Sequence, residues 1–392
     1  MSQVVGEDMI TGMGYIGLDL GRLYRMRRVP KLIDAVASGT TIIIRDATEE
    51  RPFQGLRVFG KSTQDGTPTP EAPVPIVSAG EGGSIEVKVM GKNLINIHEI
   101  KTGINVNQVE CNIFGNLVFS SVAEGLNLEK DIWRVRFVTK SGVSIYVADS
   151  KMLKNVITVA EDDPIVFYEY RNQYINSGRY TNIQLEHGDT PTEYEPYRDP
   201  QLLTLQTPNG LPGVPVAKDG NYTDANGQQW VCDEIDLKRG KYIERIWKKT
   251  LDGSEPFWGI YLTTGYEGFS TNILPFNSYR RNGFCDLFNV KEVSDFEESV
   301  WLGVNNSNIY VVKSRFFDST LEDKGLANWK AFLAGNPMTV MTYMDTPLER
   351  DITPEENAAY KALRTYGPTT VITNDTGAHM EVIYNKSNRN ME

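Results

Sequence analysis

Hydrophobic and polar residues alternate in many short runs along this chain, and residues that favour turns separate the runs. One clear example is the run SIEVKVMGK at residues 84–92. Its apolar positions, on one face, are Ile85, Val87 and Val89, and its polar positions, on the other, are Glu86 and Lys88. A period of two residues is typical of a half-buried β-strand. The run at residues 55–62, with Leu56 and Val58 on one face, predicts a strand before it.

A proline-rich segment, DGTPTPEAPVPI at residues 65–76, joins these two expected strands. It contains Pro68, Pro70, Pro73 and Pro75. Proline fixes φ and removes a backbone donor, so this segment can be neither a helix nor a central strand. We expect an extended, polyproline-like strap, which we call the strap below.

Two regions have the pattern of β-sandwiches. In residues 92–198 the strands are expected at 132–139, 144–148, 165–171 and 180–186. Several short strands separated by turns are typical of a β-sandwich or jelly roll. Residues 253–350 are also β-rich, with one expected helix, LANWKAFLAGNP. Its apolar face is Leu326, Trp329, Phe332 and Leu333, before a stop at Gly335, Asn336 and Pro337.

Between these regions, residues 199–252 read as a connector made of a Pro/Gly strap and a hairpin. The hairpin is expected to turn at Asn226-Gly227, a dipeptide favoured in two-residue turns. The strand after it places Tyr242, Glu244 and Ile246 on one face.

The C-terminal segment carries a strong helix start. Thr353 is the expected N-cap, Pro354 occupies the first helical position, and Glu356 completes a capping box. We expect this helix to run to about Arg364. A hairpin is expected over residues 368–384, and the polar tail should fray.

The first 40 residues differ from the rest because they are locally basic and apolar at near-helical spacing over residues 18–39. The basic residues are Arg22, Arg25, Arg27, Arg28 and Lys31. Two interpretations remain open: a short helix that caps the first domain, or an arm that docks on an acidic neighbouring subunit. Pro30 should end or kink the helix at Val29.

These patterns together predict a mostly β protein: two jelly-roll-like β-sandwich modules joined by strand and Pro-rich connectors, with a short N-terminal helix and a C-terminal helix plus hairpin. The expected divisions are residues 1–40 (docking arm), 41–91 (strand-strap-strand connector), 92–198 (first jelly roll), 199–252 (connector), 253–350 (second sandwich) and 351–392 (C-terminal helix and hairpin). A faint repeat, at residues 189–193 and 345–349, fits two modules with similar exits.

Composition narrows the classes of function. The 392 residues include 40 Lys and Arg against 51 Asp and Glu, a net charge of −11, which argues against general nucleic-acid binding. Three distant cysteines, Cys111, Cys232 and Cys285, favour neither a disulfide framework nor a zinc site and indicate folding in a reducing cytoplasm. Neither a secretory signal nor a membrane-spanning run is expected.

The sequence predicts no catalytic residue, cofactor or metal. Residues 219–227 are rich in oxygen ligands and could indicate calcium, but the Asn-Gly turn accounts for them. His98, His187 and His379 lack zinc-type spacing and are expected at surface or turn positions. Adjacent carboxylates point to opposite faces of a strand, so they do not make a glycosidase pair. These pairs are Asp162-Asp163, Asp233-Glu234 and Glu297-Glu298. A glycan-cleaving site built from distant residues remains open.

Aromatic residues that alternate with polar ones are the better binding candidates, because flat rings stack on sugars. They are Tyr168, Tyr170, Tyr174 and Tyr180 in the first sandwich and Trp258, Tyr261, Tyr266 and Tyr279 in the second. The competing interpretation is that these rings pack in the core or pair across strands. No individual residue can be assigned to a ligand.

Several segments resemble the minor tail and baseplate proteins of tailed phages that infect Gram-positive bacteria. They are the strap, the KNLI of residues 92–95, the IQLEHGDTPTEYEPY of residues 183–197, the hairpin region 220–246 and the C-terminal unit 352–384. In this resemblance residues 92–197 form a carbohydrate-binding-like jelly roll, with Tyr194 and Tyr197 folded back over the sandwich edge.

The resemblance implies a non-enzymatic structural protein of the virion tail tip, baseplate or fibre, made in the host cytoplasm, that presents its sandwiches for adhesion to host-surface glycans. The implied partners are other tail or baseplate proteins, further copies of the chain as a homotrimer, and a bacterial surface polysaccharide, without nucleic-acid binding or membrane insertion. The alternatives are a glycan depolymerase of the tail and an assembly-only collar or capsid fibre protein.

Overall fold

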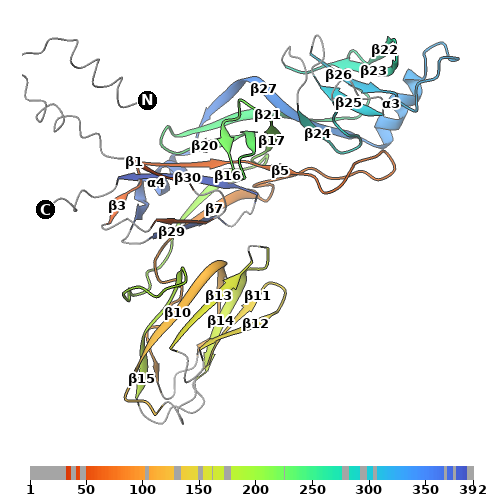
Figure 1. Ribbon diagram of the computed structural model, residues 1–392. Helices are drawn as coiled ribbons and strands as arrows, with labels where there is room; N and C mark the ends of the chain where they lie inside the picture. The colour runs from red at the N-terminus through yellow and green to blue at the C-terminus, as the bar shows by residue number, and fades with distance from the viewer. Residues whose placement is uncertain are drawn as a thin grey trace, which may run out of the picture.

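The protein has three β-rich bodies in the computed structural model (Figure 1). The structure describes residues 32–36, 41–44, 50–101, 106–127, 134–148, 153–160, 162–171, 178–224, 226–275, 282–291, 298–302, 307–365, 369–373 and 377–385. The expected mostly β fold is confirmed. We call the bodies the central sandwich, the first sandwich and the second module.

The central sandwich is built from the segments expected to be connectors. One sheet has seven strands, in the order β1 (Leu32–Val36), β30 (His379–Asn385), β4 (Gly55–Phe59), β20 (Glu234–Asp236), β21 (Lys241–Leu251), β27 (Met338–Asp351) and β24 (Gly283–Cys285). The second sheet has four, in the order β16 (Gln201–Thr207), β7 (Gly83–Gly91), β29 (Thr369–Thr373) and β2 (Thr41–Ile44). Both are antiparallel at every described pairing.

A continuous apolar core fills the space between these sheets. Ile85, Val87 and Val89 of β7 are fully buried, which confirms the alternation seen in the sequence. They belong to one cluster with Leu56 and Val58 of β4 and with residues of β2, β16, β20, β29 and β30. The described residues of the segments 41–91, 199–252 and 351–392 therefore form one folded unit.

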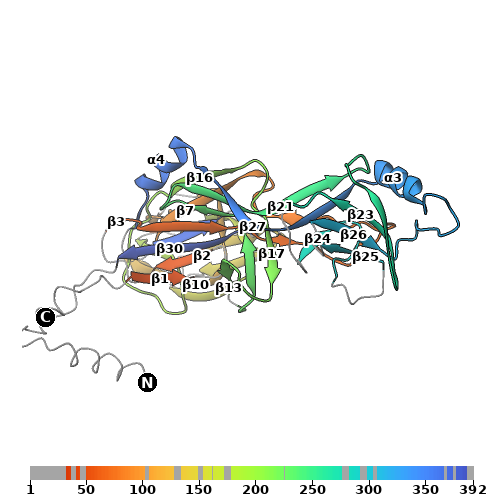
Figure 2. The same cartoon turned by 90° about the horizontal axis from the view of Figure 1, so that it is seen from above.

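The other two bodies are insertions into this unit. The first sandwich leaves after β7 and returns at β16, and these strands are paired, with Val89 opposite Gln201. The second module leaves after β21 and returns at β27, with Leu251 opposite Met338. Each insertion thus extends from the end of a hydrogen-bonded strand pair, and the two project in different directions (Figures 1 and 2).

The first sandwich consists of two four-stranded antiparallel sheets. One has the order β13 (Lys154–Val159), β10 (Gly115–Glu124), β15 (Arg179–His187) and β8 (Ile100–Lys101). The other has the order β12 (Ser144–Ala148), β11 (Arg134–Thr139), β14 (Ile165–Arg171) and β9 (Val106–Ile113). Val135 and Phe137 point into the core while Arg134 is exposed, as the alternation predicts. The four expected strands are present.

The second module contributes a single four-stranded sheet of its own, with the order β22 (Gly259–Thr263), β23 (Tyr266–Asn272), β26 (Asn308–Val312) and β25 (Ser299–Leu302). Its core closes against the far ends of β21 and β27, against β24, and against helix α3 (Leu326–Gly335). Trp329 and Leu333 of α3 are fully buried, and Leu326 and Phe332 pack beside them, which confirms the predicted helix face.

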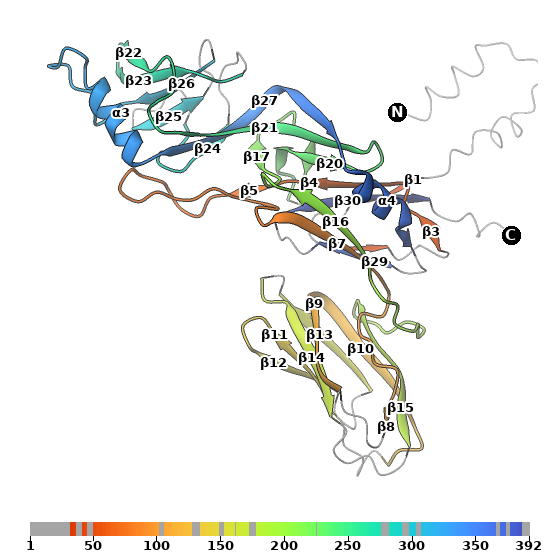
Figure 3. The same cartoon turned by 180° about the vertical axis from the view of Figure 1, so that it is seen from behind.

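The strap is the loop of a long hairpin, whose stem pairs β5 (Ser62–Thr63) with β6 (Val77–Ser78). The residues of the strap itself belong to no helix and no sheet, as expected. It reaches from the central sandwich to the second module (Figure 3). There Gln64 Nε2 donates to the Cys285 carbonyl at 2.8 Å, and the Val74 N–H donates to the Asp286 carbonyl at 2.9 Å. Arg315 of the second module also pairs with Glu71 at the strap tip. The strap therefore braces the second module.

Helix α4 (Pro354–Ala362) begins with the predicted capping box at Thr353 and Glu356. It ends before Arg364, because Leu363 is extended and β28 (Arg364–Thr365) pairs with β3 (Arg51–Pro52). Both strands expected after it form. β29 pairs with β7 and β2, whereas β30 pairs with β4 and β1, so they belong to different sheets.

Three local predictions need correction. The part of the expected N-terminal helix that the structure describes, Leu32–Val36, is strand β1, paired with β30; the basic residues Arg22 to Lys31 lie outside the described residues. Residues 189–193 form a loop, whereas residues 345–349 lie inside β27, so the faint repeat has no structural counterpart. On β21, the even alternation stops at a bulge between Glu244 and Ile246.

The hairpin expected to turn at Asn226-Gly227 is present, with β18 (Tyr222–Thr223) paired to β19 (Gln229–Cys232), which also pairs with β17 (Gly213–Val216). Its turn is longer than two residues. The Asp224 N–H donates to the Gln228 carbonyl, and the Asp224 carboxylate accepts from the N–H groups of Asn226 and Gln228.

Glu356 is expected to contribute more to stability than its exposed neighbour Glu355. The buried Glu356 carboxylate accepts from the Thr353 N–H at 2.8 Å and from the Gln206 N–H of β16 at 2.6 Å. Glu356→Ala leaves both donors unpaired and should lower the free energy of unfolding of the central sandwich by about 2–4 kcal/mol. Hydrogen exchange of the β16 amides measures this, with Glu355→Ala as the matched control. Equal effects of the two substitutions would refute it.

Candidate functional site

The aromatic candidates of the first sandwich lie in its core. Tyr168, Tyr170 and Tyr180 are at most 3% exposed and belong to the cluster between its two sheets. The alternative that these rings are structural is therefore confirmed for all three. Tyr174 lies outside the described residues.

In the second module the candidates divide. Trp258 is buried in the core, and its indole N–H donates to the Glu255 carboxylate at 2.9 Å. Tyr261 of β22 and Tyr266 of β23 are half-buried on the opposite, outer face of the four-stranded sheet. Tyr279 lies outside the described residues.

The outer face of this sheet carries a small aromatic cluster. Tyr261 lies 4.5 Å from the ring of Tyr310, and Tyr266 lies 4.7 Å from the ring of Trp301 (centroid distances). Gly268 of the intervening strand β23 stands opposite Tyr261 in the strand register. At that position β23 therefore places no side chain between the rings of Tyr261 and Tyr310. Of the sequence candidates that the structure describes, Tyr261 and Tyr266 retain partly accessible rings.

A pocket of about 170 Å³ lies at the joint between the central and first sandwiches, where the sequence indicated no site. Its walls come from β7, from the two links that lead into and out of the first sandwich, and from β9 and β14. They are Lys88, Met90, Leu94, Asn96, Val109, Glu110, Cys111, Asn112, Ile113, Tyr168, Tyr197 and Pro200. Tyr197 packs against the first-sandwich core, in keeping with its predicted fold-back.

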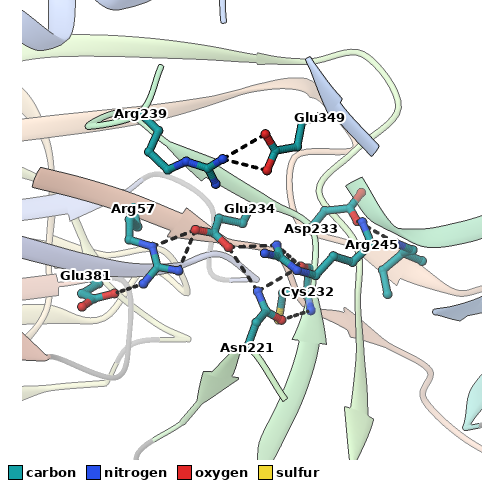
Figure 4. Close-up of polar contacts among 10 residues, drawn as sticks. Arg57, Asn221, Cys232, Asp233, Glu234, Arg239, Arg245, Glu349 and Glu381 are labelled. Atoms are coloured by element: carbon teal, nitrogen blue, oxygen red, sulfur yellow. Dashed lines mark hydrogen bonds and ion pairs between the residues drawn. The ribbon is translucent and has the colours of Figure 1, made fainter. Parts of the chain in front are cut away.

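A buried polar cluster crosses β4, β20, β21 and β30 of the central sandwich (Figure 4). The Glu234 carboxylate is 1% exposed and accepts from Arg57 at 2.7 Å and from Arg245 Nη1 at 2.8 Å. Arg57 also donates to Glu381 at 2.9 Å, and Asn221 Nδ2 donates to Glu234 at 3.3 Å. Removing one charge from such a group leaves another buried and unpaired. This cluster therefore holds the four strands together and has a structural role.

The neighbouring Asp233 closes the bulge at which β21 passes from the central sandwich to the second module. Its carboxylate accepts from the N–H groups of Arg245 and Ile246, at 2.7 and 2.8 Å. On the central side Tyr242 packs in the central core, and beyond the bulge Leu251 packs in the second-module core. Burial raises the pKa of Asp233 from its ordinary 3.8 to about 7, although both hydrogen bonds oppose this.

Of the adjacent carboxylates, Asp233 and Glu234 have separate partners. Asp233 caps the backbone of β21 while Glu234 binds the two arginines (Figure 4). Asp163 accepts from the hydroxyls of Thr139 and Ser141. Glu298 binds Arg315, and Glu297 lies outside the described residues.

The remaining chemistry-bearing residues have structural surroundings. Among the described residues, no group of three or more His, Cys, Asp and Glu side chains could hold a metal. Burial raises the pKa of the thiols of Cys111, Cys232 and Cys285, which disfavours the nucleophilic thiolate. Of the histidines, His98 is exposed as expected, but His187 and His379 are buried in strands β15 and β30.

Comparisons with known proteins find no counterpart: no protein-family model, no curated protein and no solved structure matches the chain. In the part of the chain that the structure describes, no helix is long and apolar enough to cross a membrane.

Asp233 should make the region around the β21 bulge more stable at low pH than at neutral pH. Because its folded pKa of about 7 is raised, the folded state keeps a proton that the unfolded chain releases near pH 4. This contribution is complete below about pH 4 and is lost as the pH rises to about 7, by up to roughly 4 kcal/mol. Hydrogen exchange of the β20 and β21 amides from pH 4 to 8 measures it.

Asp233→Asn should flatten this pH dependence, and Asp65→Asn, at an exposed strap position, should leave it unchanged. An unaltered slope in Asp233→Asn would assign the effect to another group.

Proposed function

We propose that this chain is a non-enzymatic structural protein of a tailed-phage virion, at the tail tip, baseplate or fibre, whose central sandwich holds two β-sandwich modules outward for adhesion to host-surface glycans. The observation that carries the proposal is the insertion of both modules at the ends of paired strands. Each module enters and leaves the central sandwich at adjacent positions, so it projects from the body that holds it.

The distribution of the family-like segments supports the same proposal. The C-terminal helix α4 and strands β29 and β30 belong to the central sandwich, while the strap and the hairpin of β18 and β19 extend from it; residues 92–95 and 183–197 lie at the two ends of the first sandwich. The segments that resemble phage tail proteins least, residues 98–180 and 254–340, form most of the two insertions. A common supporting body that carries different modules would allow related proteins to adhere to different hosts.

The proposed partners are other tail or baseplate proteins, further copies of the chain in a homotrimer, and a bacterial surface polysaccharide. Shallow aromatic surfaces such as the Tyr261–Tyr310 pair give weak single-site affinity. Several copies on one particle raise the effective affinity through effective concentration. The proposal therefore depends on multivalent display.

We expect beads that carry many copies of the intact protein to adhere to host cell walls or capsular glycan, and the free protein to bind at least about a hundredfold more weakly. Pull-down of fluorescent beads measures adhesion, and a reducing-end assay on the same samples measures cleavage. Release of new reducing ends would establish a depolymerase instead. Beads that do not adhere would favour the assembly-only function.

We also expect residues 1–31 to dock the protein in the virion. Strand β1 covers the edge strand β30, so the deletion should stop before Leu32 to keep that edge paired. Removing residues 1–31 should leave the sandwiches folded and abolish incorporation into particles, because the docking segment is lost. Changing Arg25, Arg27 and Arg28 to Glu should have the same effect, through repulsion from an acidic partner. Immunoblots of purified virions measure incorporation, and Lys154→Glu is the charge control. Normal incorporation of both variants would reduce the segment to a cap.

A further inference from the structure

The pocket at the joint between the central and first sandwiches combines a partly exposed aromatic ring with polar side chains that have no hydrogen-bond or ion-pair partner among the described residues. We propose that this joint pocket binds one sugar ring of a glycan. The ligand class rests on the proposed adhesion function, whereas the site itself comes from the contacts of the residues that line it.

The polar groups of the pocket come from separate parts of the chain. Lys88 lies on β7 of the central sandwich, Glu110 and Asn112 lie on β9, and Asn96 and Tyr197 lie on the two links. Within the described part of the chain, the side chains of these five residues make no hydrogen bond or ion pair. A cation, a carboxylate, two amides and a phenol around one small space match the donors and acceptors that adjacent sugar hydroxyls need.

The geometry of β9 adds to this polar lining. Among the described strands, β9 is the outer strand of its sheet and pairs with β14 alone, so one side of its backbone has no described strand partner. Its register shifts twice along β14, between Ile165 and Phe167 and between Tyr168 and Tyr170. Such irregularities at sheet edges are frequent beside binding sites, because they redirect side chains and end the pairing.

Of the two tyrosines that line the pocket, Tyr197 keeps a partly exposed ring, whereas Tyr168 is only 2% exposed. The Tyr168 hydroxyl accepts from the Asn96 N–H at 3.0 Å, which fixes that ring against the link. Tyr197 is half-buried, and both its ring and Cys111 pack against the first-sandwich core. The Tyr197 ring, held against the core, can stack on the apolar face of a sugar at little cost in conformational entropy.

The size of the pocket selects a single ring. Its volume of about 170 Å³ equals roughly five or six water molecules at ~30 Å³ each. That is well below the ~300–1,000 Å³ of sites for drug-sized molecules. A bound sugar would touch Lys88 of the central sandwich and β9 of the first sandwich together, so it would also fix the angle between these two bodies.

Ligand-observed NMR of the intact protein with glucose, galactose, rhamnose and N-acetylglucosamine, each tested alone, provides the test. We expect at least one of these sugars to bind with a Kd in the millimolar range. Lys88→Ala and Tyr197→Phe should each weaken that binding about tenfold, as expected for the loss of one good hydrogen bond. The matched controls are Tyr194→Phe, three residues before Tyr197 in the chain and outside the pocket lining, and Lys154→Ala on β13; neither should change the affinity.

Cys111 supplies a second readout, because it is the half-exposed thiol of the three, while Cys232 and Cys285 are buried. The bound sugar should slow the reaction of Cys111 with a small thiol reagent at alkaline pH. Absence of binding by all four sugars, or binding that both pocket substitutions leave unchanged, would overturn the proposed pocket even if coated beads adhere to cells. Pocket binding without bead adhesion would keep the site and remove the adhesion function.

Discussion

The structure depends on backbone hydrogen bonds between strands that are far apart in the sequence. The β7–β16 pairing joins residues on either side of the first sandwich, and the β21–β27 pairing does the same around the second module. Neither pair can form by closing a short turn, so the central core requires the two ends of each insertion to meet. A folded insertion whose termini already lie close together reduces the entropy lost in closing that loop. The inserted bodies therefore favour assembly of the sandwich that carries them.

Local patterns were sufficient to predict most individual elements. The alternation of Ile85, Val87 and Val89 identified β7, and the Thr353–Glu356 capping box identified the start of α4. These signals depend on residues within a few positions of one another. Partner choice between strands does not, because β4, β20 and β30 are short segments far apart in the sequence that meet only in the folded chain. This is why the central sandwich was interpreted as a set of connectors.

The candidate sites show the same limit. The spacing of Tyr168, Tyr170 and Tyr180 could not distinguish a ligand-facing ring from a core ring, and burial decided for the core. Lys88 was correctly placed on the polar face of its strand, but nothing near it in the sequence indicates Glu110, Asn112 or Tyr197 as neighbours. The polar residues of β9 were the one sequence feature that could have indicated this pocket. Asp233 was recognised as half of a carboxylate pair, yet its role requires the bulge of β21, which no residue pattern announces.

The strap and the paired strands β21 and β27 also determine how the molecule would carry mechanical load. A pull on the far end of the second module draws β21 and β27 in the same direction, so the hydrogen bonds between them are not sheared. The load passes to their outer neighbours, where β20 holds β21 and the strap holds the module through Gln64 and Val74. Tension is thus shared between two routes into the central sandwich, and the paired strands β21 and β27 do not have to bear it alone.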